Sequence, residues 1–372
     1  MILSRLALKN FRTHRNTTLN FSETLNYIVG GNGQGKTSIL EAAYYLCTTK
    51  SFNSKDIEVV TFSENEFEIN GNFKDLTEDD TKIYFSVPEN RKYYFQNNKL
   101  ISRASQIIGK FPVVILTPAD HSITQGAPSE RRKFIDSVIS QSSNTYLSLL
   151  LDYNKTLKQR SVVLNRLKEK YSKQTEAELD AWSEKLVESG VEIILHRKSF
   201  LEKYSEYIKT SYNKIVDTKE EPTIEHFYLD GSDVLDIKTN FTKLLVDKKE
   251  EEIRRTLNLV GPHKDDFIFY INKINLRTYG SQGQHKTFQA ALRFAEFFYL
   301  KDTTGKTPIF LLDDVFGELD AYRAGKISKY LKEVGQAFIT LTDFANFSFL
   351  SKEENDLIIK LENGNITYAW WI

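Results

Sequence analysis

Residues 30–37, which read GGNGQGKT, constrain the fold of this chain more than any other stretch. They follow an apolar run at residues 25–29 and precede residues 38–48, which contain few helix breakers. The stretch fits G-x-x-x-x-G-K-[ST], and a strand before it with a helix after it is the context that identifies a phosphate-binding loop. The alternative, a glycine-rich turn without a ligand, does not account for that context. We therefore predict that this loop holds the phosphates of a nucleotide.

The chemistry of the loop predicts ATP and Mg²⁺ as its ligands. Glycines allow backbone N–H groups to face a phosphate, and the N-terminus of the next helix adds a partial positive charge. We expect Lys36 to reach the β- and γ-phosphates and to contribute to catalysis, and the Thr37 hydroxyl to bind Mg²⁺. For Arg12, support of the first hairpin at the surface is an alternative to nucleotide binding. The predicted nucleotide-binding residues are Gly30, Gly31, Asn32, Gly33, Gln34, Gly35, Lys36, Thr37, Ser38 and Arg12.

A carboxylate at the end of a second buried strand would complete such a site. Residues 309–312 are four consecutive apolar residues, and Asp313 and Asp314 follow them directly. We expect Asp313 to hold the metal and Asp314 to orient a water molecule for attack on the γ-phosphate. The alternative role for Asp314 is to cap the next turn. A short acid in the catalytic position favours slow hydrolysis, as a switch requires.

Two further motifs predict that a second copy of the chain completes the site. The acids Glu318 and Asp320 follow Asp313 at a distance typical of the dimer-contacting loop of one class of ATPases. In that class two subunits enclose two nucleotides, and a Ser-x-Gly-Gln turn that opens a helix reaches the nucleotide of the partner. A hydroxyl, a glycine and a helix N-terminus repeat the physics of the first loop. The residues of this turn are Ser281, Gln282, Gly283 and Gln284.

The order of the predicted elements indicates an α/β domain built from both ends of the chain, with a helical lobe inserted in it. The predicted domain comprises residues 1–117 and 260–372, with a mixed sheet that has an antiparallel β part. An early hairpin is predicted to turn at Asn70-Gly71, and the last hairpin at Asn363-Gly364 before Trp371. Residues 337–341 read as another buried strand.

Residues 118–259 show helical spacing of apolar residues and almost no strand signals. The polar run at residues 170–178 (KYSKQTEAE) is predicted to separate two of the helices. We expect short antiparallel helices in this lobe, because the apolar seams are too short for a long coiled coil.

Composition excludes some classes of protein and leaves others open. Lysine plus arginine and aspartate plus glutamate each total 50, so a basic surface can arise only if charges segregate within the fold. The single cysteine, Cys47, lies in an apolar run, which predicts a buried structural thiol and no internal disulfide. No apolar stretch approaches the ~20 residues that span a bilayer, and the N-terminus lacks a signal-peptide core. We therefore expect a cytoplasmic protein without a membrane partner.

With these motifs, the whole chain resembles the RecF family among the ABC-type ATPases of chromosome maintenance. The resemblance implies an ABC-type P-loop ATPase head, a weak DNA-stimulated ATPase that acts as a switch, and a homodimer that forms on ATP binding. It implies a clamp on DNA near single-strand gaps in recombinational repair and replication. The implied partners are DNA, RecR and, indirectly, RecO and RecA. The segments that carry the resemblance are residues 8–12 (LKNFR), 118–128 (PADHSITQGAP), 131–136 (RRKFID), 261–266 (GPHKDD), 281–286 (SQGQHK) and 311–326 (LLDDVFGELDAYRAGK).

One departure concerns the residue that senses the γ-phosphate. Many ABC-type ATPases place a glutamine at the end of the strand before Thr117 and a histidine after residues 337–341, and this chain has neither. Thr340, Thr342 and Asp343 are the candidates for that role.

A basic cluster lies in the predicted helical lobe. We interpret it as a contact surface for the phosphate backbone of DNA, and the alternative is an ordinary solvated helix face. No base-reading motif is visible, so binding should depend on DNA shape and on salt. His263 is interpreted as a structural or relay residue, with direct catalysis as the alternative. The residues expected to contact DNA are Arg131, Arg132, Lys133, Lys158 and Arg160.

Two classes of function remain open at this point. The first is the DNA-repair clamp in which ATP is a switch. The second is the ATPase head of another SMC-like or ABC-type machine, either structural, nuclease-associated or part of a transporter. The inserted lobe is too short for a long-coil chromosome-organising protein.

Overall fold

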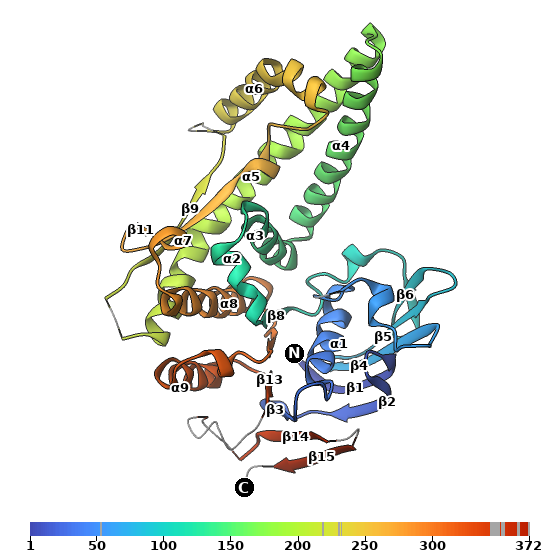
Figure 1. Ribbon diagram of the computed structural model, residues 1–372, viewed down its shortest axis with the longest axis vertical. Helices are drawn as coiled ribbons and strands as arrows, with labels where there is room; N and C mark the ends of the chain where they lie inside the picture. Colours follow the sequence, from blue (N-terminus) through green and yellow to red (C-terminus); the bar gives the residue numbers. More distant parts are fainter. Residues whose placement is uncertain are drawn as a thin grey trace. The chain divides into compact units, whose positions relative to one another are not determined.

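The computed structural model describes residues 1–52, 54–217, 219–229, 231, 233–342, 350, 354–362 and 365–370. The chain divides into two compact units, and Figure 1 labels most of their elements. The first unit comprises Met1–His121, Tyr207–Glu220 and Gln282–Ile372, and the second comprises Ser122–Glu206 and Glu221–Ser281. The sequence predicts residues 260–281 as part of the ATPase domain, but in the structure they lie in the second unit. The reason is that the strand at residues 266–271 pairs with one at residues 222–227.

An antiparallel sheet with the order β2-β1-β4-β5-β6-β7 forms one part of the first unit. Buried and partly exposed residues alternate along β4, so one face of the sheet packs into a core. Helix α1 (Lys36–Thr48) contributes to the same core, where the rings of Phe11, Tyr45 and Phe67 meet edge to face. The strands are β1 (Ile2–Phe11), β2 (His14–Asn20), β4 (Glu66–Lys74), β5 (Glu78–Ser86), β6 (Arg91–Gln96) and β7 (Lys99–Ile101).

The predicted turn at Asn70-Gly71 is wrong, because both residues lie inside β4 and pair with β1 and β5. The chain turns instead at residues 75–77, where the Asp75 N–H donates to the Thr77 carbonyl at 3.0 Å. Gly71 serves packing: a Cβ at this position would lie 2.5 Å from Cδ1 of Leu46, a buried residue of α1. The glycine therefore marks a close approach of helix and strand.

A second sheet of the first unit has the order β15-β14-β3-β13-β12-β8. All residues of β3, β8, β12 and β13 are buried, as expected for parallel strands that are covered on both faces. The predicted strands at residues 25–29, 309–312 and 337–341 are confirmed with the same bounds. The predicted turn at Asn363-Gly364 and Trp371 lie outside the described residues. The strands are β3 (Leu25–Val29), β8 (Val113–Leu116), β12 (Ile309–Leu312), β13 (Ala337–Leu341), β14 (Leu357–Glu362) and β15 (Asn365–Trp370).

Two helices of the first unit follow the motifs described above. Helix α8 (Gln282–Thr304) begins within the Ser-x-Gly-Gln turn, and helix α9 (Ala321–Tyr330) follows the acid pair. Cys47 is buried in α1, as predicted, and burial raises the pKa of its thiol. No helix in the described part of the chain is long and apolar enough to cross a membrane.

The second unit is mainly helical. The prediction of short helices is wrong for α5, which has 43 residues and continues into the first unit. Only residues 170–172 separate it from α4, because the Ser172 hydroxyl accepts from the Thr175 N–H and starts the helix inside the polar run. Its elements are α2 (His121–Gln125), α3 (Pro128–Ser142), α4 (Asn144–Glu169), α5 (Lys173–Ile215), β9 (Pro222–Phe227), α6 (Val234–Arg255), β10 (Asp266–Ile271), β11 (Ile274–Asn275) and α7 (Leu276–Tyr279).

Replacing Gly71 by valine should destabilise the protein. The two γ-methyl groups have no space between β4 and α1, and overpacking of this kind typically costs about 1–3 kcal/mol. Urea unfolding monitored by circular dichroism measures the change. Gly325→Ala on α9 is the matched control, since a Cβ there meets no atom within 4 Å and should leave stability equal or higher. Equal stability of the wild type and Gly71→Val would contradict the packing role.

Candidate nucleotide-binding site

The carboxyl ends of three neighbouring parallel strands form the site. Strand β13 lies between β3 and β12, and it pairs in parallel with both. The glycine-rich loop leaves β3, and Asp313 leaves β12. The Gly30 N–H donates to the Leu341 carbonyl at 3.2 Å, so the loop starts against the end of β13. The sheet order thus brings residues that are far apart in the sequence to one edge.

The glycines of the loop have the conformations that the motif requires. Gly33 and Gly35 have φ of 78° and 89°, in the left-handed region that side chains disfavour. A Cβ on Gly35 would also lie 2.6 Å from Nε2 of His14 and 2.7 Å from Oγ1 of Thr13. His14 contacts the Gly35 carbonyl through Nε2 at 3.1 Å, and burial lowers the pKa of His14. Thr13 and His14, in the first hairpin, therefore pack against the loop.

Lys36 is the first residue of α1 and is held along the loop. Its Nζ donates to the carbonyls of Gly30 at 2.7 Å and Gly31 at 2.9 Å. Burial lowers the pKa of Lys36, and the nearby carboxylates of Asp314 and Asp313 oppose this shift. An ammonium group that is partly desolvated beside phosphate-binding N–H groups interacts strongly with a multiply charged anion.

Two hydroxyl groups converge on one carboxylate oxygen. The Thr37 Oγ1 and the Thr340 Oγ1 each donate to Oδ1 of Asp313 at 2.9 Å. The same Thr340 hydroxyl accepts from the backbone N–H of Asp314 at 2.8 Å. Burial raises the pKa of Asp313, and the two hydroxyl donors oppose this shift. Thr340 is a central residue of the site, whereas Thr342 is exposed and Asp343 lies outside the described residues.

The oxygen atoms at this position fit Mg²⁺. Hydroxyl and carboxylate oxygens are ligands that Mg²⁺ prefers, and the ion usually takes one or two of them together with phosphate oxygens and water. Within the described ranges, no group of three or more histidine, cysteine, aspartate or glutamate side chains could hold a metal by itself. Thr37 and Asp313 thus suit an ion that is bound together with a nucleotide.

Asp314 has an unusual backbone conformation. Its φ is 52°, in the left-handed region, where aspartate and asparagine are tolerated far better than longer or branched residues. Its side chain is exposed, beside the loop that holds Lys36. The hydrogen bond from its N–H to Thr340 fixes the backbone from which the carboxylate projects.

Arg12 lies against the helix of the phosphate-binding loop. Its Nε and Nη2 donate to the two carboxylate oxygens of Glu41 at 2.8 Å, and Nη2 also donates to Ser54 at 2.7 Å. Hydrogen bonding to Glu41 raises the pKa of Arg12. Because Glu41 belongs to α1, this pair joins the end of β1 to the loop's helix.

The start of α8 and the acid pair lie together, although they are far apart in the sequence. The Arg323 guanidinium covers Gly283, where a Cβ would lie 2.9 Å from Nη2. Its Nε donates to Oγ1 of Thr287 at 2.8 Å, and it forms an ion pair with Asp320. Asp320 also caps α9 by accepting from the Arg323 N–H at 2.9 Å.

Further hydrogen bonds involve residues near the start of α8 and the acid pair. Lys286 donates to the Glu318 carbonyl, and Gln284 donates to Glu220 at 2.7 Å. Ser281 directly precedes α8 as the last residue of the second unit. The sequence argument missed Arg323 and Thr287, and the signal that identifies Arg323 is its position three residues after the capping Asp320.

In the second unit, two of the residues expected to contact DNA are interior. Arg131 is 4% exposed and forms a two-pronged ion pair with Asp266, and Arg160 is 1% exposed and pairs with Glu252. Buried guanidinium groups need such partners, since unpaired charges are costly to desolvate. The expectation that Arg131 and Arg160 contact DNA is therefore corrected. Lys133 and Lys158 are exposed, and Arg132 is partly exposed.

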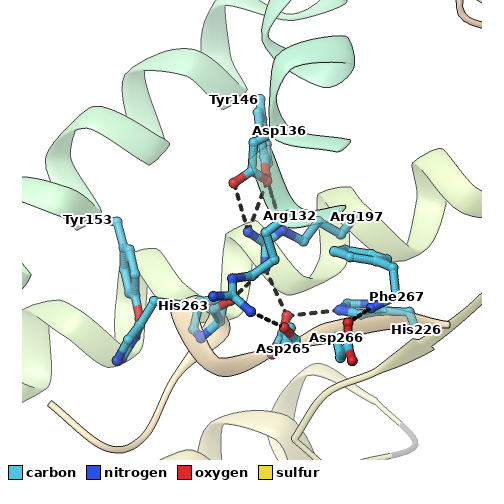
Figure 2. A network of polar contacts seen from close by, with 11 residues as sticks. Arg132, Asp136, Tyr146, Tyr153, Arg197, His226, His263, Asp265, Asp266 and Phe267 are labelled. Atoms are coloured by element: carbon cyan, nitrogen blue, oxygen red, sulfur yellow. Dashed lines mark hydrogen bonds and ion pairs between the residues drawn. The ribbon is translucent and has the colours of Figure 1, made fainter. Parts of the chain in front are cut away.

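A buried polar network surrounds Arg197, as Figure 2 shows. Arg197 is 2% exposed and bridges Asp136 and Asp265, each at 2.9 Å. His226 contacts the same Oδ2 of Asp265 at 2.8 Å. The network joins α3 and α5 to the start of β10 and therefore fixes the Gly-Pro-His turn that precedes this strand.

His263 in this turn has partners on both ring nitrogens. Nε2 lies 3.1 Å from the Asn258 carbonyl, which can only accept, so this nitrogen carries the proton and Nδ1 accepts from Tyr153 Oη at 2.7 Å. Burial lowers the pKa of His263 to about 4. The arrangement matches the structural interpretation of this histidine.

Comparisons with known proteins identify the family of this chain. The chain is 38% identical over 362 residues to DNA replication and repair protein RecF of Chloroherpeton thalassium, covering 94% of this chain and 96% of that protein. It is 37% identical over 352 residues to the protein of the same name in Salinibacter ruber, covering 92% of this chain and 85% of that protein. The chain belongs to the RecF family. The family model described as RecF/RecN/SMC N terminal domain matches residues 2–364.

Solved structures confirm the predicted ABC-type ATPase fold of this RecF-family chain. A structure of the recombination mediator protein RecF with ATPrS, in the RecFOR pathway, matches with a TM-score of 0.89 at 33% identity, covering 99% of this chain and 98% of that chain. The Smc head domain of Pyrococcus furiosus matches with a TM-score of 0.57 at 16% identity, covering 99% of this chain and 96% of that chain. At that identity the second match shows the fold alone.

Replacing Thr340 by valine should destabilise the carboxyl end of the parallel sheet in this RecF-family protein. The substitution keeps the shape but removes the buried hydrogen bond to Asp313 and leaves the partly buried Asp314 N–H without its acceptor. Leaving a buried polar group unsatisfied costs about 1–3 kcal/mol. Urea unfolding monitored by tryptophan fluorescence measures the loss. Thr340→Ser keeps the hydroxyl oxygen and should lose clearly less stability, and equal losses in the two variants would contradict the hydrogen-bonding role.

The stability of the protein should decrease as the pH is lowered, because His263 then becomes protonated. Its pKa of about 4 lies below the ordinary value of 6.5, so the folded state binds fewer protons than the unfolded state between these pH values. The contribution of neutral His263 is complete above pH ~6.5 and should decrease by about 2 kcal/mol at pH ~5. Urea unfolding of the wild type and of His263→Gln at pH ~7 and ~5 tests this. A pH dependence that is equally steep in the variant would contradict it.

Proposed function

We propose that this protein is an ATP-dependent DNA-binding switch of recombinational repair and replication. The observation that carries the proposal is the meeting of Thr37 and Asp313, whose side-chain oxygens lie 2.9 Å apart beside the glycine-rich loop. A hydroxyl and a carboxylate beside phosphate-binding N–H groups suit a nucleoside triphosphate with Mg²⁺. Relatives that are named DNA replication and repair protein RecF, and a RecF structure with ATP at 33% identity, support it.

In this proposal the loop binds the phosphates and the strand ends complete the site. Lys36 exchanges its two carbonyl partners for phosphate oxygens, while the N–H groups of residues 31–38 surround the β-phosphate. Thr37 and Asp313 would hold Mg²⁺, which would supply Lewis-acid polarisation of the phosphate oxygens. Arg12 acts through Glu41 by holding α1 in place.

Asp314 is the proposed catalytic residue. Its carboxylate orients a water molecule and accepts its proton during attack on the γ-phosphate. The left-handed backbone at this position favours a short acid over glutamate, and Thr340 holds that backbone. A single short acid favours slow hydrolysis, which suits a switch whose bound state must last long enough to act.

We propose that a second copy of the chain completes each nucleotide-binding site. Ser281, Gly283 and the N-terminus of α8 would face the γ-phosphate that is bound by the other subunit, and the loop with Glu318 and Asp320 would contact that subunit. Such a contact is isologous, so two identical sites close together. ATP drives this closure only as far as it binds the dimer better than the monomer.

DNA is the proposed ligand of the dimer. Lys133 and Lys158 are exposed cations on neighbouring helices of the second unit, and they are suited to contact phosphates without reading bases. We further propose that the clamp acts near single-strand gaps with RecR, and through RecR and RecO promotes the loading of RecA. The similarity to a RecF structure described as in the RecFOR pathway supports a role in that pathway.

ATP should convert the monomer into a dimer, and Asp314→Asn should trap that dimer. Asparagine tolerates the same backbone conformation but cannot accept the proton of water. Size-exclusion chromatography with light scattering, with and without ATP and duplex DNA, measures the association. The variant dimer should dissociate at least about tenfold more slowly than the wild type, in line with the usual weight of a general base.

Lys36→Arg is the companion variant, because it keeps the charge but not the compact ammonium group that fits the loop. It should lose ATP-dependent dimerisation and DNA binding while remaining folded by circular dichroism. A wild type that stays monomeric with ATP and DNA would refute the clamp. Unchanged dissociation of Asp314→Asn would remove Asp314 from the catalytic role.

A further inference from the structure

The second unit contains a cleft of about 240 Å³ that the nucleotide site does not use. Helices α3, α4 and α5 and the Gly-Pro-His turn line it. Its walls include two segments that carry the family resemblance, residues 131–136 and 261–266, and both contribute to the network in Figure 2. Their convergence on one cleft indicates a role beyond the support of α5.

Each polar side chain that remains available in the cleft can donate a hydrogen bond. Ser129, Lys133 and Asn154 have no hydrogen-bond or ionic partner among the described residues. Arg132 donates only Nη1, to the Asp265 carbonyl, so its other N–H groups are available. Burial and the positive charge of Arg197 lower the pKa of Arg132, while the carboxylates of Asp265 and Asp136 oppose this shift. An anion beside Arg132 would therefore be stabilising.

The acceptors of the cleft are already used. Asp136 accepts from Arg197 and from the Tyr146 hydroxyl. His263 has a partner on each ring nitrogen, and one of them is the Tyr153 hydroxyl. Every open group of the cleft can donate, and two of them, Arg132 and Lys133, are cations that cannot accept, so the site favours a ligand whose oxygens accept.

We propose that this cleft binds a phosphate group of a DNA strand, held by Arg132, Lys133, Ser129 and Asn154. The inference rests on the proposed function, since it assigns a place to one of the contacts between the protein and DNA. An arginine fork, a lysine and a hydroxyl form a common set of phosphate ligands, and they match the several acceptor oxygens of a phosphate better than the two of a carboxylate.

The position of Lys158 on α4 favours a polyanion as the ligand. Lys158 lies four residues after Asn154 on the same helix, so the two side chains project from one face about one turn apart. Both are exposed. The phosphates of DNA form a regular series, so a second phosphate can meet Lys158 while the first occupies the cleft. An isolated acidic side chain would use only one of these positions.

Two variants test the cleft with gapped duplex DNA in the presence of ATP, by fluorescence anisotropy from about 50 to 200 mM salt. Lys133→Gln should weaken binding several-fold and reduce the salt slope by about 1, because one phosphate contact is lost. Asn154→Asp places a carboxylate against the phosphate and should weaken binding roughly tenfold. The controls are Lys243→Gln on α6 and Asn165→Asp on α4, which make the same charge changes at exposed positions outside the cleft.

The outcomes separate this inference from the proposed function. Loss of affinity in both cleft variants, with controls within about twofold of the wild type and an unchanged ATP-induced dimer, supports the phosphate site. If the wild type binds DNA with ATP and both cleft variants bind equally well, the cleft inference alone is overturned. A wild type that does not bind DNA overturns both. Variants that keep DNA affinity but lose binding to poly-glutamate would assign the cleft to an acidic protein segment instead.

Discussion

The hydrogen bonds of the Thr340 hydroxyl hold the nucleotide-binding site together. Strand β13 separates the strand that carries the glycine-rich loop from the strand that carries Asp313, so no backbone bond can join these two directly. The Thr340 hydroxyl joins β13 to the end of β12, because it donates to Asp313 and accepts from the Asp314 N–H. Thr37 reaches the same Asp313 oxygen from the loop. Asp313 and Asp314 are thus positioned by one buried hydroxyl, and Thr37 is joined to them through the shared Asp313 oxygen.

The sequence predicts the strands and the loop of this candidate site well, because their determinants are local. Residues 25–29, 309–312 and 337–341 are short, continuous apolar runs, and strands that are buried on both faces need such runs. The loop motif requires glycines at defined positions, and Gly33 and Gly35 adopt the left-handed conformations that explain them. Thr340 is harder to assign from sequence, because a threonine inside a buried strand gives no local sign of its partners.

The errors arise where tertiary contacts override local patterns. Asn70-Gly71 has the composition of a turn, but Gly71 is needed because Leu46 of α1 packs closely against β4 at this position. The residues next to Gly71 in the sequence give no sign of this contact. Strand β9 escapes prediction because three of its six residues are exposed and its apolar signal is weak. Arg131 and Arg160 look like part of a basic surface, yet each has a carboxylate partner more than 90 residues away, Asp266 and Glu252 respectively. Charge counts along a helix cannot show such pairing.

Arg323 links the two motifs that the proposed dimer would present to its partner. Its guanidinium lies on Gly283 at the start of α8, and the same group pairs with Asp320 in the acid-containing loop. Because the guanidinium is planar and its donors are fixed in direction, it transmits a shift of either element to the other. The start of α8 and the loop are therefore joined by one side chain. In the proposed dimer, a nucleotide that binds the start of α8 would thereby also affect the position of the loop that is proposed to contact the other subunit.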